Sequence, residues 1–200
     1  MSIIQKSLKY SIYLASQSPR RIELLKWLGI NFNIASKLNV SEEYPSSLNG
    51  SEIAIYISEK KSDAYSEIIK DNRLVITADT IVLCEQKVLG KPTDKKNAIE
   101  MLKQLSNKKH IVTTAVTLRT INKKLTFFEE TEVKFKQLLE EEINYYVDNY
   151  NVYDKAGSYG IQDWIGLIGI EKINGCFFNV MGFPTQRFTN EFIKFSDLPL

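Results

Sequence analysis

Apolar and polar residues alternate along the chain with two periods, and these predict interleaved strands and helices. Short apolar runs rich in β-branched residues indicate strands, and apolar residues three or four apart indicate helices. Strands are predicted over residues 11–15, 31–35, 74–84, 88–89, 110–118 and 125–135. Helices are predicted over residues 19–28, 51–70, 94–105, 140–150 and 185–195, and a hairpin over residues 168–180 that turns at Asn174 and Gly175. This order predicts an α/β fold, as one domain or two small lobes.

The turn between the first strand and the first helix has the sequence Ser-Gln-Ser-Pro-Arg-Arg. Ser18 is a favourable N-cap, and Pro19 suits the first helical position. A helix start exposes unpaired N–H groups, and here the hydroxyls of Ser16 and Ser18 and the guanidinium groups of Arg20 and Arg21 accompany it. The turn therefore suits a phosphate group. A capped surface helix with two solvated arginines explains the same residues, so the turn alone does not decide.

Two charged residues occupy positions where the pattern predicts apolar ones. Lys61 lies in the apolar stripe of the predicted helix 51–70. Either its alkyl stem covers apolar surface, or its ammonium enters a polar site that holds an anionic partner. Asp79 interrupts the β-branched strand 74–84. Because burying a lone carboxylate costs several kcal/mol, Asp79 is expected to be paired with a cation, bound to a metal or placed at a cleft.

The loops supply further polar groups. Glu42 lies in the polar stretch 37–50 and is either solvated or a metal ligand. Lys91 precedes a proline, which restricts it to extended geometry. Residues 154–162 hold two glycines, two charges, a hydroxyl and an amide, a density typical of loops that approach ligands closely. His110, the only histidine, begins a strand, and we interpret it as structural.

Composition excludes several classes of function. Twenty-six basic residues against 24 acidic ones give a net charge of +2, which provides no general attraction for nucleic acid or an anionic membrane. No apolar run approaches the roughly 20 residues of a membrane span, and the first ten residues lack a signal-peptide core. No P-loop sequence occurs. Cys84 and Cys176 lack metal-ligand spacing, so we predict reduced core thiols in a cytoplasmic protein.

Six motifs occur in the order found in the Maf family. They are Ser-x-Ser-Pro-Arg-Arg at residues 16–21, Lys61 in its helix, Ala-Asp-Thr at 78–80, Gly-Lys-Pro at 90–92, Asp-Lys-Ala-Gly at 154–157 and Tyr-Gly-Ile-Gln at 159–162. On these motifs the chain resembles a Maf nucleotide pyrophosphatase from about residue 12 to residue 195. Because they span nearly the whole chain, coincidence is a poor explanation.

The resemblance implies both a fold and an activity. The fold is a single Maf-like domain over residues 1–200, with an elongated mixed β-sheet flanked by helices and two lobes around a central cleft, similar to inosine triphosphate pyrophosphatases. The activity is hydrolysis of a nucleoside triphosphate to the monophosphate and pyrophosphate with a divalent cation, Mg²⁺ or Mn²⁺. The Asp-Thr pair at residues 79 and 80 resembles the subgroup that acts on dTTP and UTP, whereas an Asp-Gln subgroup prefers 7-methyl-GTP. A homodimer and a link to arrest of cell division are also implied.

Residue roles follow from matching each motif. The family's proposed general base falls on Asp79, which together with Glu42 would also serve the metal; whether Asp79 is base, ligand or both stays open. Arg21, Lys61 and Lys91 match the family's triphosphate-binding positions, and the hydroxyls of Ser16 and Ser18 join them as phosphate-binding groups because they accompany the helix start in the first turn. The positions that set base preference are Arg20, Thr80 and Gln162.

Two departures from the family pattern and two other functions are considered. Glu59 stands where many relatives carry a lysine, and Asn151-Val152-Tyr153 replaces a Glu-Pro-hydrophobic sequence.

One alternative function is a nucleotide-binding regulator of septum formation without significant turnover, against which the intact Asp79, Lys61 and Lys91 argue. The other is a broad-specificity sanitising pyrophosphatase that acts on deaminated purine triphosphates.

Overall fold

The computed structural model describes residues 2–198. Their backbone forms two compact units. The first unit takes its residues from Met1–Asp79, Thr114–Glu129 and Gly182–Leu200, and the second from Thr80–Thr113 and Glu130–Met181. The chain therefore passes from the first unit to the second between Asp79 and Thr80.

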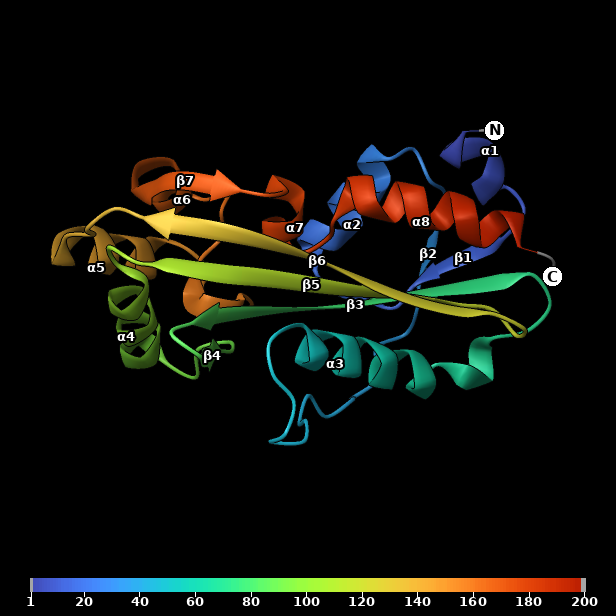
Figure 1. Ribbon diagram of the computed structural model, residues 1–200, viewed down its shortest axis with the longest axis horizontal. Coiled ribbons are helices and arrows are strands. Elements are labelled where there is room, and N and C mark those ends of the chain that lie inside the picture. Colours follow the sequence, from blue (N-terminus) through green and yellow to red (C-terminus); the bar gives the residue numbers. More distant parts are fainter. Residues whose placement is uncertain (1, 199–200) are drawn as a thin grey trace. The chain divides into compact units, whose positions relative to one another are not determined.

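The predicted α/β class is confirmed, because the described residues form a seven-stranded mixed sheet with helices (Figure 1). The strands are β1 (Ser11–Leu14), β2 (Asn33–Ile34), β3 (Arg73–Cys84), β4 (Lys87–Leu89), β5 (Lys109–Arg119), β6 (Lys124–Phe135) and β7 (Ile170–Asn174). Their order is β2-β1-β3-β5-β6-β7, with β4 paired to β3. β1 is parallel to β2 and to β3, whereas β4 is antiparallel to β3 and β7 to β6.

The helices follow the predicted spacing in most places. They are α1 (Ile3–Ser7), α2 (Pro19–Trp27), α3 (Ser51–Ala64), α4 (Lys95–Leu105), α5 (Glu140–Asn149), α6 (Trp164–Gly169), α7 (Phe177–Met181) and α8 (Thr185–Asp197), with 3₁₀ turns η1 (Ser66–Ile68) and η2 (Ala156–Ser158). Among the described residues, no helix has both the length and the apolar character to cross a membrane.

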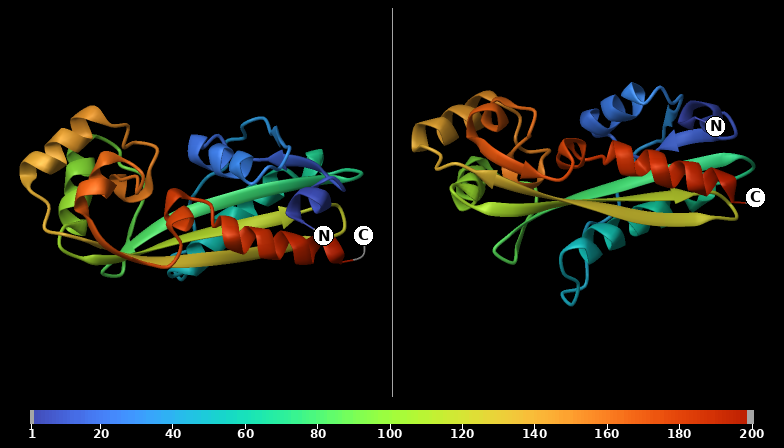
Figure 2. Two further views of the ribbon diagram at one scale, coloured as in Figure 1. Left: turned by 90° about the horizontal axis from the view of Figure 1, so that it is seen from above. Right: turned by 45° about the horizontal axis from the view of Figure 1, so that its top comes forward.

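In the first unit, helices cover both sides of the strands. α3 lies on one side, and α2 and α8 lie on the other (Figures 1 and 2). Each helix buries an apolar face, formed by Leu24 and Leu25, Ile53 and Ile57, and Phe188 and Phe192. α1, for which the sequence pattern made no prediction, packs against α8. An ion pair between Lys6 and Asp197 joins the two.

In the second unit, α4 packs against α5 and η2. The predicted face of α4 is confirmed, because Ala98, Met101, Leu102 and Leu105 are all buried. Asp94 caps this helix by accepting a 2.8 Å hydrogen bond from Asn97 N. The cap satisfies one of the N–H groups that a helix start leaves without a partner.

The predicted helix 51–70 is shorter than expected. Ser51 is its first residue and Gly50 takes the cap position, while the helix ends at Ala64, which is exposed rather than buried. Tyr65 is the reason. Its ring packs with Ala15, Ala35 and Val75, and its hydroxyl donates to Ser36 O at 2.9 Å. These tertiary contacts outweigh the helical periodicity that continues to Ile68.

The predicted hairpin over residues 168–180 is wrong. Residues 164–169 and 177–181 are the helices α6 and α7, and β7 pairs with β6 instead. A short apolar run fits a strand and a buried helix equally well, so the hydrophobic periodicity of residues 168–180 could not distinguish the two. Gly166 is needed for α6, because a Cβ there would lie 2.0 Å from the carbonyl oxygen of Ile161.

The two cysteines are free, as predicted. Cys84 is buried in β3, whereas Cys176 is partly exposed. The interpretation of Cys176 as a core thiol is therefore wrong, because it lies in the segment between β7 and α7 rather than on a buried strand.

Candidate functional site

The turn between β1 and α2 has the geometry that its sequence predicts. Ser18 occupies the N-cap position and Pro19 begins the helix. The Ser18 side chain makes no capping hydrogen bond, and the Ser18 N–H donates to Ser16 Oγ at 3.2 Å. Both hydroxyls therefore lie at a helix start whose N–H groups and partial positive charge favour an anion.

Arg21 links this turn to β3 and to the segment before α8. Its Nε donates to Gly182 O and its NH1 to Ala78 O, both at 2.9 Å. Burial lowers the pKa of Arg21, while the negative charge of Asp79 acts in the opposite direction. Arginine stays charged in proteins, so the guanidinium forms a fixed positive charge next to the residue that precedes Asp79.

Lys61 and Asp79 form an ion pair. Lys61 Nζ lies 2.6 Å from Asp79 Oδ1 and 2.7 Å from Glu42 Oε1. The Asp79 side chain is 10% exposed and that of Lys61 17%, whereas Glu42 is 46% exposed. Of the two interpretations of Lys61, the polar site with an anionic partner is confirmed. For Asp79, the structure shows the pairing with a cation.

The protonation of Asp79 is set by its burial. Desolvation raises the pKa of Asp79, and the charges of Lys61 and Arg21 lower it without cancelling that effect. A carboxylate that accepts a proton more readily than a solvated one suits general base catalysis. Within the part of the chain that the structure describes, the Asp79 carboxylate accepts a hydrogen bond from Lys61, through Oδ1. Its second oxygen, Oδ2, makes no hydrogen bond to the described residues.

Three hydroxyl residues that the sequence interpretation missed hold α3 against the strands. Ser58 Oγ lies 2.9 Å from Thr117 Oγ1, and Thr77 Oγ1 donates to Ser58 O at 2.8 Å. Ser58 lies one turn before Lys61 on α3, and Thr77 lies two residues before Asp79 on β3. The hydrogen bonds therefore fix the spacing between the two charged partners. The sequence offered one indication of these contacts, because Ser58 is a polar residue next to Ile57 on the buried side of the helix.

The donors near Asp79 bear on the predicted divalent cation. Asp79 and Glu42 both contact Lys61, so they lie on one small area of the first unit. Among residues 2–198, no group of three or more His, Cys, Asp or Glu side chains could hold a metal ion. Two carboxylates suit Mg²⁺, which is often bound by one or two carboxylates together with substrate phosphates. They do not suit a metal held by protein ligands alone.

Three predicted site residues, Thr80, Lys91 and Gln162, belong to the second unit. Thr80 follows Asp79 on β3, and adjacent strand residues point to opposite faces. Lys91 is exposed on the loop after β4, and Gly157 N donates to Gly90 O at 3.0 Å. This hydrogen bond brings the Gly-Lys-Pro and Asp-Lys-Ala-Gly motifs side by side. Gln162 lies on the loop before α6, where its Nε2 donates to Asp163 Oδ1 at 2.9 Å.

The structure thus divides the predicted site residues between the two units. Ser16, Ser18, Arg20, Arg21, Glu42, Lys61 and Asp79 lie in the first unit, and Thr80, Lys91 and Gln162 in the second. Arg21, Lys61, Glu42 and Asp79 are joined by the contacts given above. Glu59, which departs from the family pattern, accepts a 2.7 Å hydrogen bond from Thr126 Oγ1 and lies 3.5 Å from Lys124 Nζ. Its carboxylate therefore pairs with β6 in the first unit.

His110 is buried in the second unit, in keeping with its interpretation as structural. Its Nε2 lies 2.7 Å from the Tyr159 hydroxyl, and its ring stacks on Phe135 with centroids 5.6 Å apart. Burial lowers the pKa of His110 to about 4. The imidazole is therefore neutral near pH 7.

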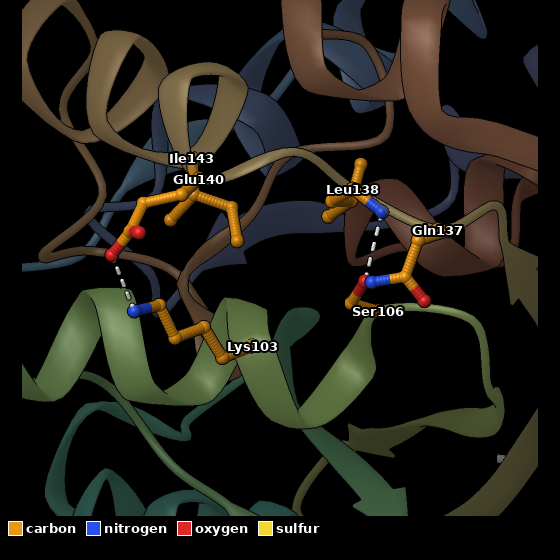
Figure 3. Close-up of a pocket in the computed structure, with 6 residues that line it drawn as sticks. All are labelled: Lys103, Ser106, Gln137, Leu138, Glu140 and Ile143. Carbon is orange, nitrogen blue, oxygen red and sulfur yellow. Dashed lines mark hydrogen bonds and ion pairs between the residues drawn. The ribbon is translucent and has the colours of Figure 1, made fainter.

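A pocket of about 320 Å³ in the second unit contains none of the predicted site residues (Figure 3). Its lining residues are Lys103, Ser106, Gln137, Leu138, Glu140 and Ile143. Lys103 Nζ lies 2.7 Å from Glu140 Oε1, and Leu138 N donates to Ser106 Oγ at 2.8 Å. These two contacts pair the charged groups and the hydroxyl of the lining with one another, and we assign the pocket no ligand.

Comparison with known proteins adds to this geometry. The family described as "Maf-like protein" matches residues 11–195. The chain belongs to the Maf family. A curated Maf relative from Bacteroides thetaiotaomicron, named dTTP/UTP pyrophosphatase, is 50% identical over 186 residues that cover 93% of this chain and 96% of the relative. Relatives of the same name are 48% identical in Parabacteroides distasonis and 42% identical in Porphyromonas gingivalis; each covers 94% of this chain, over 97% and 96% of their own lengths.

Solved structures similar to this Maf chain are more distant. A HAM1 protein from Coxiella burnetii superimposes with a TM-score of 0.39 and 16% identity, covering 63% of this chain and 73% of its own. A nucleoside-triphosphatase described as a dITP/XTP pyrophosphatase from Mycobacterium abscessus gives a TM-score of 0.40 and 14% identity, covering 64% and 75%. The family membership predicted from the six motifs is confirmed by the family match and the curated relatives.

Proposed function

We propose that this Maf family member is a nucleoside triphosphate pyrophosphatase that hydrolyses dTTP and UTP to the monophosphate and pyrophosphate. The observation that carries the proposal is the arrangement of Asp79, a buried carboxylate paired with the Lys61 ammonium at 2.6 Å and close to the fixed charge of Arg21. Relatives at 42–50% identity that are named dTTP/UTP pyrophosphatase support the substrates.

In the proposed reaction, water attacks the α-phosphorus. A bond forms between the water oxygen and the α-phosphorus, the bond from the α-phosphorus to the α–β bridging oxygen breaks, and pyrophosphate leaves. The proton of the attacking water passes to Asp79, whose Oδ2 makes no hydrogen bond to the described residues. General base catalysis of this kind contributes a factor of roughly 10²–10⁴ in rate.

Positive charge near Asp79 opposes the charge of the triphosphate, which is about −4 at neutral pH. Arg21, Lys61 and the start of α2 with Ser16 and Ser18 supply it in the first unit. We assign Lys91 to the same triphosphate by its family motif. A divalent cation, Mg²⁺ or Mn²⁺, would be held by Asp79 and Glu42 together with phosphate oxygens, and when bound it neutralises charge that develops on the phosphates.

Base preference is assigned to Arg20, Thr80 and Gln162. The hydroxyl of Thr80 and the amide of Gln162 provide hydrogen-bonding groups that can discriminate a pyrimidine edge from close analogues. We also propose a homodimer, which the family resemblance implies and which light scattering during size-exclusion chromatography would detect as twice the 23.0 kDa chain mass.

The deciding experiment measures pyrophosphate release from a panel of dTTP, UTP, CTP, inosine triphosphate and 7-methyl-GTP, with Mg²⁺, with Mn²⁺ and with chelator. We expect metal-dependent turnover with dTTP and UTP as the best substrates. Inosine triphosphate as the best substrate would favour the sanitising pyrophosphatase, and binding of dTTP without pyrophosphate release would favour the regulator. Either result would overturn the proposal.

A further inference from the structure

The carboxylate of Asp163 joins three side chains of the second unit. Oδ1 accepts from Gln162 Nε2 at 2.9 Å, and Oδ2 accepts from the Tyr146 hydroxyl at 2.7 Å. The Lys155 ammonium lies 3.6 Å from Oδ2. The side chain of Asp163 is 16% exposed and that of Lys155 9%, so the network is largely removed from solvent.

This network determines which way the Gln162 amide points. A carboxylate has lone pairs and no hydrogen to donate, so the group that faces Asp163 Oδ1 must be the amide NH₂. Oε1 then points away from Asp163. It is buried and makes no hydrogen bond to any described residue. A buried acceptor without a partner is unfavourable, and a donor on a ligand would satisfy it.

Other residues hold the carboxylate in place. Gly160 N donates to the Tyr146 hydroxyl at 3.0 Å, which orients that hydroxyl as a donor toward Asp163 Oδ2. A Cβ at residue 160 would lie 2.5 Å from Asp163 Oδ2 and 2.6 Å from Gln162 Nε2, so only glycine permits this approach. Lys155, from the Asp-Lys-Ala-Gly motif, pairs with Asp154 at 3.0 Å and donates to Asn151 O. Tyr146 and Lys155 therefore keep hydrogen-bond donors on the Oδ2 side.

We propose that Asp163 is a positioning residue that fixes the Gln162 amide so that Oε1 acts as an acceptor toward the nucleobase. Uracil and thymine carry an N3–H donor, whereas the N3 of cytosine is an acceptor whose lone pair would face Oε1. The fixed amide thereby selects uracil and thymine over cytosine. The inference rests on the proposed function, in which Gln162 reads the base.

The test is Asp163→Asn, which keeps the shape of the side chain. Tyr146 and Lys155 hold the oxygen of the introduced amide on the Oδ2 side, so its NH₂ faces Gln162 in place of an acceptor. Gln162 must then turn its own oxygen toward this NH₂ and its own NH₂ toward the base. We expect the ratio of kcat/KM for UTP to that for CTP to fall by about tenfold or more.

Gln162→Glu added to Asp163→Asn provides the rescue. The introduced glutamate accepts from the NH₂ of the introduced asparagine with one oxygen and presents an acceptor to the base with the other. We expect the UTP to CTP ratio to return toward the wild-type value. Loss of folding or of general activity lowers kcat/KM for UTP and for CTP together. The ratio of the two values therefore separates base recognition from a structural effect.

Tyr145→Phe is the matched control for Tyr146→Phe. Tyr145 is exposed and packs on Trp164 with centroids 4.7 Å apart, outside the network, so its hydroxyl should be dispensable. Tyr146→Phe removes the donor that holds Asp163 Oδ2 in place, so the carboxylate should orient Gln162 less firmly and the ratio of kcat/KM for UTP to that for CTP should fall. Tyr145→Phe should leave this ratio unchanged. Thermal unfolding of each variant verifies that it is folded.

The outcomes separate this inference from the proposed function. Wild-type protein that releases no pyrophosphate from UTP or dTTP refutes the proposed function and, with it, the inference. If wild-type protein is active, an Asp163→Asn ratio within about twofold of wild type refutes the inference alone. The same holds if the double variant fails to restore the ratio, or if Gln162→Ala leaves it unchanged.

Discussion

Replacement of Asp79 by asparagine tests both the proposed chemistry and the physical account of its pKa. Asparagine keeps the shape of the side chain and an oxygen that can accept from Lys61, but it removes the charge and the proton-accepting ability. Lys61 Nζ lies 2.6 Å from Asp79 Oδ1, and both side chains are largely buried. The variant therefore changes charge with little change in packing.

The expected loss of turnover follows from the role of a general base. Such catalysis contributes roughly 10²–10⁴ in rate, so kcat for dTTP should fall at least about a hundredfold. Stability should change little. Because desolvation raises the pKa of Asp79 despite Lys61 and Arg21, ionising Asp79 costs free energy in the folded protein. Removing that charge should cost less than about 1 kcal/mol near pH 7, because the Lys61 ammonium that remains keeps Glu42 as a partner at 2.7 Å. A buried charge left without a partner would cost about 3–5 kcal/mol.

The pH dependence of stability gives a second measurement. A pKa that is raised on folding means that the folded state binds the proton more tightly than the unfolded state. The stability of the wild type relative to Asp79→Asn should therefore be greatest below the ordinary value of 3.8, and it should fall as the pH rises through the folded pKa. Urea unfolding at several pH values measures this difference.

Two results would refute this reasoning. An Asp79→Asn enzyme that retains more than about a tenth of wild-type turnover would exclude the general base role. A loss of more than about 3 kcal/mol in unfolding free energy at pH 7 would show that the ionised Asp79 carboxylate stabilises the fold, which contradicts its raised pKa.

Two further predictions concern other buried titratable groups. Lys61→Met leaves the Asp79 carboxylate buried without the Lys61 ammonium, so it should raise KM for dTTP and lower the unfolding free energy at pH 7 by about 3–5 kcal/mol. Adding Asp79→Asn should restore most of that stability but no activity. A double variant as unstable as Lys61→Met would contradict this account. Because the pKa of His110 is lowered to about 4, the folded state resists its protonation, and the wild type should lose about 2–3 kcal/mol relative to His110→Gln between pH 7.5 and pH 4.5 in urea unfolding. Parallel pH profiles of the two proteins would exclude His110 as the cause.

Most elements could be predicted because their signals are local. Pro19 after Ser18 starts α2, and Asp94 caps α4 by bonding Asn97 N, both within three residues in sequence. The errors occur where distant contacts decide. α3 ends at Ala64 because Tyr65 packs against β1 and β3, and residues 168–180 do not form a hairpin because β7 pairs with β6. Periodicity carries no information about such partners.

The candidate site shows the same division. The sequence singled out Asp79 and Lys61 because charge at an apolar position is visible in the pattern, and it supplied Arg20, Thr80 and Gln162 through family motifs. It gave no indication that Glu42 and Asp79 share the Lys61 ammonium, 19 and 18 residues away along the chain. It also left the orientation of the Gln162 amide undefined.

By itself, then, the sequence determined the α/β class, the family and the identity of the residues that carry its motifs, because these depend on residue type, order and short-range spacing. Tertiary structure alone decided which charges are paired, how burial shifts the pKa values of Asp79 and His110, and which atom of Gln162 is left to accept a hydrogen bond. Hydrogen bonding and desolvation act over a few ångströms in space. Their outcome therefore depends on which distant parts of the chain the fold brings together.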